Sequence, residues 1–316
     1  MTFVPTLPRC FSRWFLSRLI LVVGLGAAPV NALAGDAKLA WQGVSGAAGY
    51  RVSYGVTSGK YTKTLDVGNK TSTTVTGLTD GTRYFFAVRA YKGSLTSGYS
   101  NEISTVVGAL VAAYGFNESS GTTVSDSSGK GNHGTLLNAT RTTGKFGGAL
   151  SFNGSNSLVT IPDKSSLDLT NGMTLSAWLY PTTTLSGWKS LIAKERTGGL
   201  TYALHANSDL TKPNNALYIG TSYRHLSTGS QLPANKWTHL AATYDGSTQR
   251  LFVNGVQVGS RSQTGSLSVT ANPLRIGGNT VLSGRNFKGH IDEVRVHNRA
   301  LIAAEIAAMS KQAVAQ

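Results

Sequence analysis

The sequence predicts an all-β protein built from two β-sandwich domains. The chain has 316 residues, which is too long for one ordinary sandwich and favours two domains. Short apolar runs alternate with turns rich in Asn, Asp, Ser and Gly, of which there are 37, and this pattern is typical of many short strands. Hydrophobic residues make up 40% and charged residues 14% of the chain, which excludes a disordered composition.

The first 34 residues are predicted to be a signal peptide. Three arginines precede an apolar stretch from Leu19 to Val30, and the small residues Ala32-Leu33-Ala34 resemble a cleavage site. Because the apolar stretch is too short for a comfortable membrane span, we expect cleavage after Ala34 and no transmembrane segment in the mature form. The alternative is an uncleaved anchor. We therefore expect a secreted protein, extracellular or periplasmic.

Charge and cysteine usage narrow the classes of partner. The formal net charge is +15, but no dense Lys/Arg run of the kind found in nucleic-acid-binding arms is present, so we expect no nucleic-acid partner. The charge indicates either a soluble basic surface or attraction to an anionic matrix, such as acidic polysaccharide or cell envelope. Cys10 is the only cysteine, so the mature chain has no disulfide, thiol nucleophile or cysteine metal site.

Residues 35–107 are predicted to form the first sandwich, with seven short strands. In one of them, Tyr50, Val52 and Tyr54 alternate onto one face. Tyr84 opens a later strand after a corner that starts at Leu78, where a tyrosine hydroxyl can bond back to the upstream backbone. The strands with the clearest pattern are 38–41, 49–54, 71–75 and 84–91.

Four residues of this first domain carry a resemblance to a known family. Trp41, Tyr50, Leu78 and Tyr84 stand where the fibronectin type III family keeps its core and its tyrosine corner, and the segment resembles that family over about 70 residues. Asp80 stands where the family often has proline. The resemblance implies a spacer or adhesion module, with its aromatic residues in the core.

Residues 108–316 are predicted to form the second, larger domain. An Asn254-Gly255 pair, which accepts positive φ at both positions, is expected to turn a hairpin between residues 249 and 258. A short amphipathic helix is expected over residues 303–309. The other expected strands are 110–116, 158–161, 173–180, 237–244 and a last one within 290–301.

Sequence motifs in the second domain carry a second resemblance. They are Tyr114-Gly-Phe-Asn-Glu118, Asp126-Ser-Ser-Gly, Gly147-Gly-Ala-Leu-Ser-Phe, Trp237-Thr-His-Leu and Ile291-Asp-Glu-Val-Arg. In this order and spacing they resemble the laminin-G-like, concanavalin A-like jelly roll of bacterial secreted proteins. The resemblance implies two stacked antiparallel sheets with a concave face, but it does not fix a ligand.

We expect no enzymatic activity. Glucanases of this fold align catalytic carboxylates on one strand in a Glu-x-Asp-x-Glu pattern, which is absent here. Asp292 and Glu293 are adjacent, so a strand would point them to opposite faces, and we expect one structural and one solvated carboxylate. The six histidines form no His-Glu-x-x-His pair or other local zinc spacing.

Ligand-binding residues are sought among aromatic and cationic side chains in the second domain. Planar rings stack on sugars, and polar groups hold their hydroxyls. Trp188 follows a Ser-Gly pair in an expected loop, His225 is expected in another loop, and Trp178 and Trp237 are expected in the core. A solvated loop is the alternative for the residues around His225. The predicted ligand contacts are Trp188, Tyr202, Tyr223, Arg224, His225 and Arg285.

The jelly-roll resemblance also implies a region for structural calcium. Asp126, Asn132 and Asp292 lie in the matching segments, and Glu118 is a further ligand in this hypothesis. Calcium takes six to eight oxygen ligands, so such an ion would tie the long 117–134 loop to the last strand. The alternative is an Asx turn at Asp126 and a strand-end hydrogen bond at Asp292.

These observations favour a secreted, non-catalytic protein that binds carbohydrate, extracellular matrix or cell envelope through the second domain. The ligand is expected to be anionic if the basic charge takes part in binding. The alternatives are a structural adhesion or spacer protein without glycan binding, and an accessory subunit of a secreted enzyme complex.

Overall fold

The computed structural model describes residues 19–21, 34–79 and 82–314. The chain divides into two compact units, Met1–Ala109 and Leu110–Gln316. Both are β structures, which confirms the predicted fold class. Apart from Ala34 and the three residues of a short strand, β1 (Leu19–Leu21), which pairs with the first long strand, the predicted signal peptide lies outside the described residues. Among the residues described, no helix is long and apolar enough to cross a membrane.

The first unit is a sandwich of two antiparallel sheets. Between residues 34 and 106 it has the seven strands that the sequence predicts. One sheet has the order β1-β2-β5, and the other has the order β4-β3-β6-β7 with β8 also paired to β6. The strands are β2 (Ala34–Trp41), β3 (Gly49–Gly55), β4 (Lys63–Gly68), β5 (Ser72–Thr79), β6 (Arg83–Lys92), β7 (Leu95–Thr96) and β8 (Ile103–Val106).

The core of the first unit contains the residues that carried the resemblance to the fibronectin type III family. Trp41, Tyr50 and Leu78 are buried in one apolar cluster. Tyr84 is partly buried against this cluster, and its hydroxyl accepts the backbone N–H of Thr79 at 3.3 Å. The tyrosine corner is therefore confirmed. Phe86 and Tyr54 also serve the core, whereas Tyr99 lies outside it and is 46% exposed.

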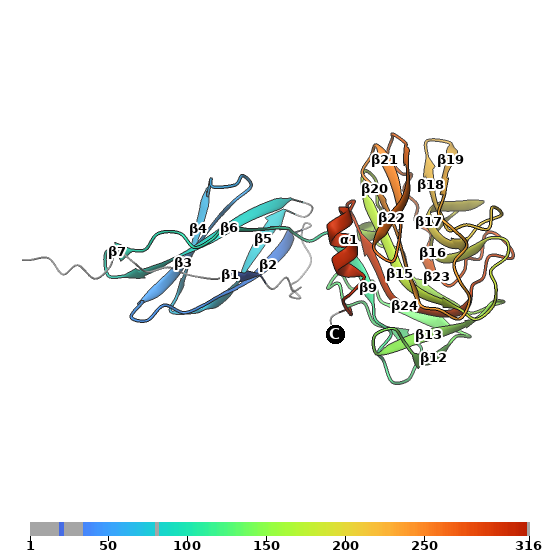
Figure 1. Cartoon of the computed structure of the whole chain (residues 1–316), viewed down its shortest axis with the longest axis horizontal. Helices are drawn as coiled ribbons and strands as arrows, with labels where there is room; N and C mark the ends of the chain where they lie inside the picture. Colours follow the sequence, from blue (N-terminus) through green and yellow to red (C-terminus); the bar gives the residue numbers. More distant parts are fainter. Residues whose placement is uncertain (1–18, 22–33, 80–81, 315–316) are drawn as a thin grey trace, which may run out of the picture. The chain divides into compact units, whose positions relative to one another are not determined.

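The second unit is a jelly roll of two larger antiparallel sheets (Figure 1). We name them after a central strand. The β17 sheet runs in order through β10 (Thr123–Val124), β11 (Gly134–Leu137), β14 (Leu158–Ile161), β23 (Leu274–Ile276), β16 (Lys189–Arg196), β17 (Gly199–Asn207), β18 (Asn214–Ile219) and β19 (Ser222–Ser227). The β15 sheet runs through β12 (Thr140–Thr143), β13 (Gly148–Asn153), β24 (Lys288–His297), β15 (Met173–Pro181), β20 (Thr238–Tyr244), β21 (Thr248–Val253) and β22 (Val256–Ser262), with β9 (Leu110–Tyr114) also beside β24.

The main core of this unit lies between the two sheets, because alternate residues of each strand point inward. On β17, for example, Tyr202 and Leu204 join the core, while Ala203 and His205 face outward. The predicted hairpin is present, with Asn254 at φ 50° and Gly255 at φ 81°. A short 3₁₀ helix, η1 (Ser165–Leu167), lies between β14 and β15.

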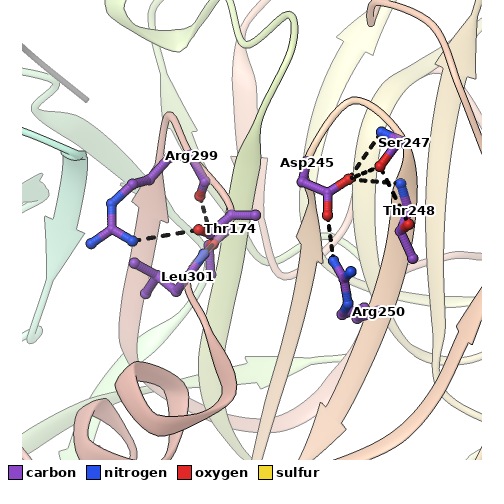
Figure 2. A network of polar contacts seen from close by, with 8 residues as sticks. Thr174, Asp245, Ser247, Thr248, Arg250, Arg299 and Leu301 are labelled. Atoms are coloured by element: carbon purple, nitrogen blue, oxygen red, sulfur yellow. Dashed lines mark hydrogen bonds and ion pairs between the residues drawn. The ribbon is translucent and has the colours of Figure 1, made fainter. Parts of the chain in front are cut away.

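The helix α1 (Ala303–Met309) closes the chain as predicted and covers part of the β15 sheet (Figure 1). Ile306 and Met309 pack against Ala241 and Phe252 on the outer face of that sheet. Thr174 of β15 holds the segment that leads into the helix, since its hydroxyl donates to the carbonyl of Arg299 at 2.7 Å and accepts the N–H of Leu301 at 2.9 Å (Figure 2). The helix is therefore fixed on the sheet at both its start and its apolar face.

Candidate functional site

A group of aromatic and guanidinium side chains lies on the outer face of the β17 sheet. Strand alternation places them there: on β19, Leu226 points into the core, so Tyr223 and His225 point outward. Their cross-strand neighbours Tyr218 and Ala216 lie on the same face of β18. We call this group the Trp188 patch, and it consists of Trp188, Arg196, His205, Tyr218, Tyr223, His225 and Arg285.

The rings of the Trp188 patch form one continuous row. The Trp188 ring centroid lies 5.1 Å from that of His205 and 5.4 Å from that of His225. His225 stacks on Tyr223 with centroids 5.7 Å apart and an interplanar angle of 24°. Tyr223 in turn meets Tyr218 edge to face at 5.1 Å. A row of this kind offers ring edges and faces to a flat ligand.

Two arginines cover the two ends of this row. The guanidinium carbon of Arg285 lies 4.7 Å from the Trp188 centroid, and that of Arg196 lies 3.6 Å from the Tyr218 centroid. These are cation–π distances. Among the described residues neither arginine forms an ion pair, so both cations have charge to offer an anion. Burial lowers the pKa of Arg285, while the nearby Asp209 raises it.

The histidines of the Trp188 patch are neutral. Burial lowers the pKa of His205 to about 3, with Arg285 and His225 adding to the shift. Burial and the same arginine also lower the pKa of His225. His205 shares a hydrogen bond of 3.1 Å with Ser190 through Nδ1, whereas its buried Nε2 has no partner in the described part of the chain. Ser190 and His205 are both fully buried, and no carboxylate among the described residues hydrogen-bonds to this imidazole. The pair as placed therefore has neither the access nor the orienting acid that a serine hydrolase uses.

Four of the six predicted ligand residues come together in the Trp188 patch: Trp188, Tyr223, His225 and Arg285. His225 lies on a strand rather than in a loop. The pairing of Tyr218 with Tyr223 across a hairpin was the sequence signal that could have added Tyr218. His205 and Arg196 carried no comparable signal.

The other two predicted ligand residues lie elsewhere. Tyr202 is a core residue, 1% exposed, and its hydroxyl donates to the carbonyl of Leu167 at 2.9 Å. It lies on the inward face of β17, so the prediction of a ligand contact was wrong. Arg224 lies between Tyr223 and His225 on β19, and alternation therefore turns its side chain away from the row.

The two tryptophans expected in the core lie outside it. Trp178 is 8% exposed but lies on the outer face of the β15 sheet, beneath Phe146 and next to His239. Trp237 precedes β20, is only partly buried, and contacts Tyr180. Each contacts further rings on its own side, Trp178 with Phe146 and His239, and Trp237 with Tyr180 and His290.

The residues predicted to bind calcium form hydrogen bonds of their own. Asp126 is 8% exposed, and its two oxygens accept four hydrogens, from the N–H groups of Ala113, Ser128 and Asn132 and from the Ser128 hydroxyl, at 2.7–2.9 Å. The Asn132 amide donates to the carbonyl of Val111 at 2.6 Å. These donors direct partial positive charge to the places where a cation would sit, so the Asx-turn alternative describes this carboxylate.

Glu118 and Asp292 complete the predicted set but contact other partners. Glu118 accepts the N–H of Ser125 at 2.6 Å and pairs with Arg141 at 2.8 Å. Asp292 accepts the N–H groups of Phe146 at 3.0 Å and Glu293 at 2.6 Å. Within the described ranges no three His, Cys, Asp or Glu side chains gather in a cluster that could hold a metal ion. The four residues as placed do not fit a shared calcium ion.

The adjacent carboxylates of β24 are both buried, contrary to the expectation that one would be solvated. Burial raises the pKa of Asp292 to about 7. Glu293 is also fully buried, where it pairs with Arg295 at 2.8 Å and accepts the N–H of Val314. A bulge in the β15–β24 pairing at this point removes the simple alternation that the expectation assumed.

Comparison with known proteins places both units. The family model for the concanavalin A-like lectin/glucanases superfamily matches residues 153–307, and the fibronectin type III model matches residues 30–106. A curated relative, mouse (Mus musculus) pappalysin-1, is 39% identical over 82 residues, which are 24% of this chain and 5% of that protein. The chain thus spans a small fraction of this relative.

Solved structures share the fold at low sequence identity. Domain 4 of AbnA, a GH43 extracellular arabinanase from Geobacillus stearothermophilus, in complex with arabinotriose, is 22% identical with a TM-score of 0.52, over 64% of this chain and 98% of that one. The binding domain of Paraclostridial Mosquitocidal Protein 1 is 17% identical with a TM-score of 0.54, over 64% and 52% of the two chains. The botulinum neurotoxin serotype G binding domain is 14% identical with a TM-score of 0.50, over 64% and 50%. These likenesses show the fold, and the family models show that the chain carries a fibronectin type III domain followed by a concanavalin A-like domain of the lectin/glucanases superfamily.

Proposed function

We propose that the jelly-roll domain binds a glycan at the Trp188 patch and does not cleave it. The observation that carries this proposal is the row of rings capped by Arg285 and Arg196, neither of which has an ion-pair partner among the described residues. Rings supply flat contact area, and neutral imidazoles and tyrosine hydroxyls hydrogen-bond sugar hydroxyls.

The charge of the patch favours an anionic glycan. Asp209 is the acidic side chain that reaches the row, and its carboxylate accepts the indole N–H of Trp188 at 2.5 Å. The patch therefore holds two guanidiniums without an ion pair and this single carboxylate, which lies near Arg285. Guanidinium matches the geometry of a carboxylate or sulfate group on a ligand. We propose an acidic polysaccharide of the extracellular matrix or cell envelope as the partner, in keeping with the N-terminal signal peptide that the sequence predicts.

Similar structures support glycan binding and also suggest an alternative function. The similar domain 4 of AbnA was solved with arabinotriose bound, whereas other similar structures are receptor-binding domains of neurotoxins. Adhesion to a protein receptor, or service as an accessory subunit, is therefore the second candidate. The absence of cleavage rests on the buried Ser190–His205 pair and on the buried, separately bonded carboxylates of β24.

The test is a glycan array with the full chain, repeated at two salt concentrations. We expect preference for uronate-containing glycans, weakened at high salt because exposed charges are screened. Arg285→Ala should weaken binding about tenfold, or about 1.4 kcal/mol, since one charge-assisted contact is lost. The matched control is Lys236→Ala, which removes an exposed cation outside the patch. Binding to protein receptors but to no glycan would replace this proposal by the adhesion alternative.

A further inference from the structure

A second pocket opens on the outer face of the other sheet of the jelly roll, beside helix α1. Its volume is about 420 Å³, and it is lined by Lys145, Phe146, Trp178, Asn254, Ser310 and Lys311. Pockets of roughly 300–1,000 Å³ hold small-molecule ligands. None of these residues belongs to the Trp188 patch, which lies on the β17 sheet.

One wall of this pocket is an aromatic corner. Phe146 and Trp178 meet edge to face, with centroids 6.4 Å apart and an interplanar angle of 78°. The corner is fixed from below, because Asp292 lies opposite Trp178 in the strand pairing and its carboxylate accepts the N–H of Phe146 at 3.0 Å. The loop between β12 and β13 is thereby held over the sheet.

The opposite wall comes from the end of helix α1 and from the β21–β22 turn. Ile306 and Met309 fix the helix on the sheet. The turn approaches the helix closely, since a Cβ added to Gly255 would lie 3.1 Å from the Cα of Ala307. Three segments far apart in sequence are therefore held in place, and the pocket is formed without a ligand.

The polar groups of this pocket are donors in excess. Lys145 lies with Nζ 4.8 Å from the Trp178 centroid, and Lys311 is exposed at the helix end. Neither lysine forms an ion pair with any residue that the structure describes. The carboxylate of Asp292, which holds the Phe146 backbone, is buried and already bonded to backbone N–H groups.

We propose that this pocket is a second binding site of the jelly roll, for a sugar ring that bears a carboxylate. The Phe146–Trp178 corner gives a ring two flat walls, and the two lysines supply the countercharge for its carboxylate. The volume between three fixed segments suits one or two rings, which favours a sugar over an extended acidic peptide. The site does not depend on glycan binding at the Trp188 patch.

The experiment is a titration of the full chain with sodium glucuronate at low salt, followed by ligand-observed NMR and tryptophan fluorescence. Glucose serves as the neutral ring, and an acidic hexapeptide serves as the anion without a ring. We expect glucuronate to bind at least tenfold more tightly than glucose. Lys145→Ala and Lys311→Ala should each weaken glucuronate binding about tenfold, as the loss of one charged contact does.

Two controls assign the signal to this pocket. Lys288→Ala removes an exposed cation elsewhere on the domain and should leave glucuronate binding unchanged. Arg285→Ala removes the cation of the Trp188 patch, so the effects of Lys145→Ala and Lys311→Ala are measured in that background as well, where the tenfold losses should persist. Equal binding of glucose and glucuronate, indifference to both pocket lysines, or tighter binding of the hexapeptide would each overturn the proposal. The melting temperatures of all variants verify that the fold is retained.

Discussion

The 117–134 loop and the Trp188 patch both gather polar side chains on the jelly roll, but they use them differently. In the loop, each oxygen of the Asp126 carboxylate accepts two hydrogens from neighbouring groups. In the patch, the guanidinium of Arg285 has no hydrogen-bond or ion-pair partner among the described residues. Bonds completed inside the protein indicate a structural role, whereas donors left over are available to a ligand.

The largest expected effect is a loss of stability when the Asp126 carboxylate is removed from the 117–134 loop. Asp126→Ala would leave three backbone N–H groups and a hydroxyl without their acceptor in a site that is 8% exposed. Each buried group that loses its partner costs about 1–3 kcal/mol, so we expect a loss of at least about 3 kcal/mol in the free energy of unfolding. Urea denaturation of the jelly-roll unit, followed by circular dichroism, measures it.

Asp245 supplies a matched control for this substitution. It also accepts four hydrogen bonds, from the N–H groups of Ser247 and Thr248, the Ser247 hydroxyl and Arg250, at the β20–β21 turn (Figure 2). Its carboxylate is exposed, so water can replace the lost acceptor in Asp245→Ala. We expect a loss of about 1 kcal/mol there. Equal losses at the two sites would show that burial does not decide the value of these bonds.

The sequence predicted the strands, turns and helix of the jelly roll better than it predicted which strand residues face the core and which face outward. The strand pattern, the Asn254-Gly255 turn and the helix 303–309 depend on local composition, and all three are confirmed. The inward or outward side of a strand depends on register, which is set by tertiary pairing. For this reason Tyr202 was assigned to a ligand although it faces the core, and Trp178 was assigned to the core although it faces outward.

Long-range pairing also limited the prediction of sites. Residues such as Trp188, Tyr223, His225 and Arg285 stood out by type, and the fold brings them together. Arg196 and His205 could not be recognised, because their roles arise only when neighbouring strands of the sheet are aligned. The pocket beside α1 could not be predicted from the sequence either, since three segments that are far apart in the chain form it.

A smaller effect is expected when the buried histidine of the Trp188 patch is forced to take a proton. The folded-state pKa of His205 is lowered from 6.5 to about 3. Its contribution to stability is therefore fully present above pH 6.5 and is lost as the pH falls toward 3. One such group changes the free energy of unfolding by at most about 1.4 kcal/mol per pH unit. His205→Phe should accordingly reduce the loss between pH 6.5 and 4.5 by up to about 2.8 kcal/mol.

The contribution of His205 is isolated by comparing how steeply the free energy of unfolding changes with pH in the variant and in the natural chain, rather than by comparing absolute stabilities. His239 and His297 are also buried, with pKa values lowered to about 3, so the variant retains part of the acid sensitivity. The fibronectin type III unit contains no histidine and provides an internal reference. An unchanged pH dependence in His205→Phe would mean that the patch admits water and that this imidazole titrates normally.

The smallest expected effect concerns calcium, because the loop that was predicted to bind it has its acceptors already occupied. An ion that binds only the folded state at a hundredfold excess over its dissociation constant would raise stability by about 2.7 kcal/mol. To coordinate it, Asp126 would have to release N–H groups that lie 2.8–2.9 Å from its oxygens, and Asp292 would have to leave the N–H of Phe146. We therefore expect the melting temperature of the jelly-roll unit to be the same in calcium and in chelator. The same should hold for the melting temperature of the Asp292→Asn variant. A melting temperature that rises with calcium in the natural chain but not in Asp292→Asn would contradict this expectation. It would show that the 117–134 loop can exchange its internal hydrogen bonds for metal ligands, and the contrast between a closed structural loop and an open binding patch would then not hold.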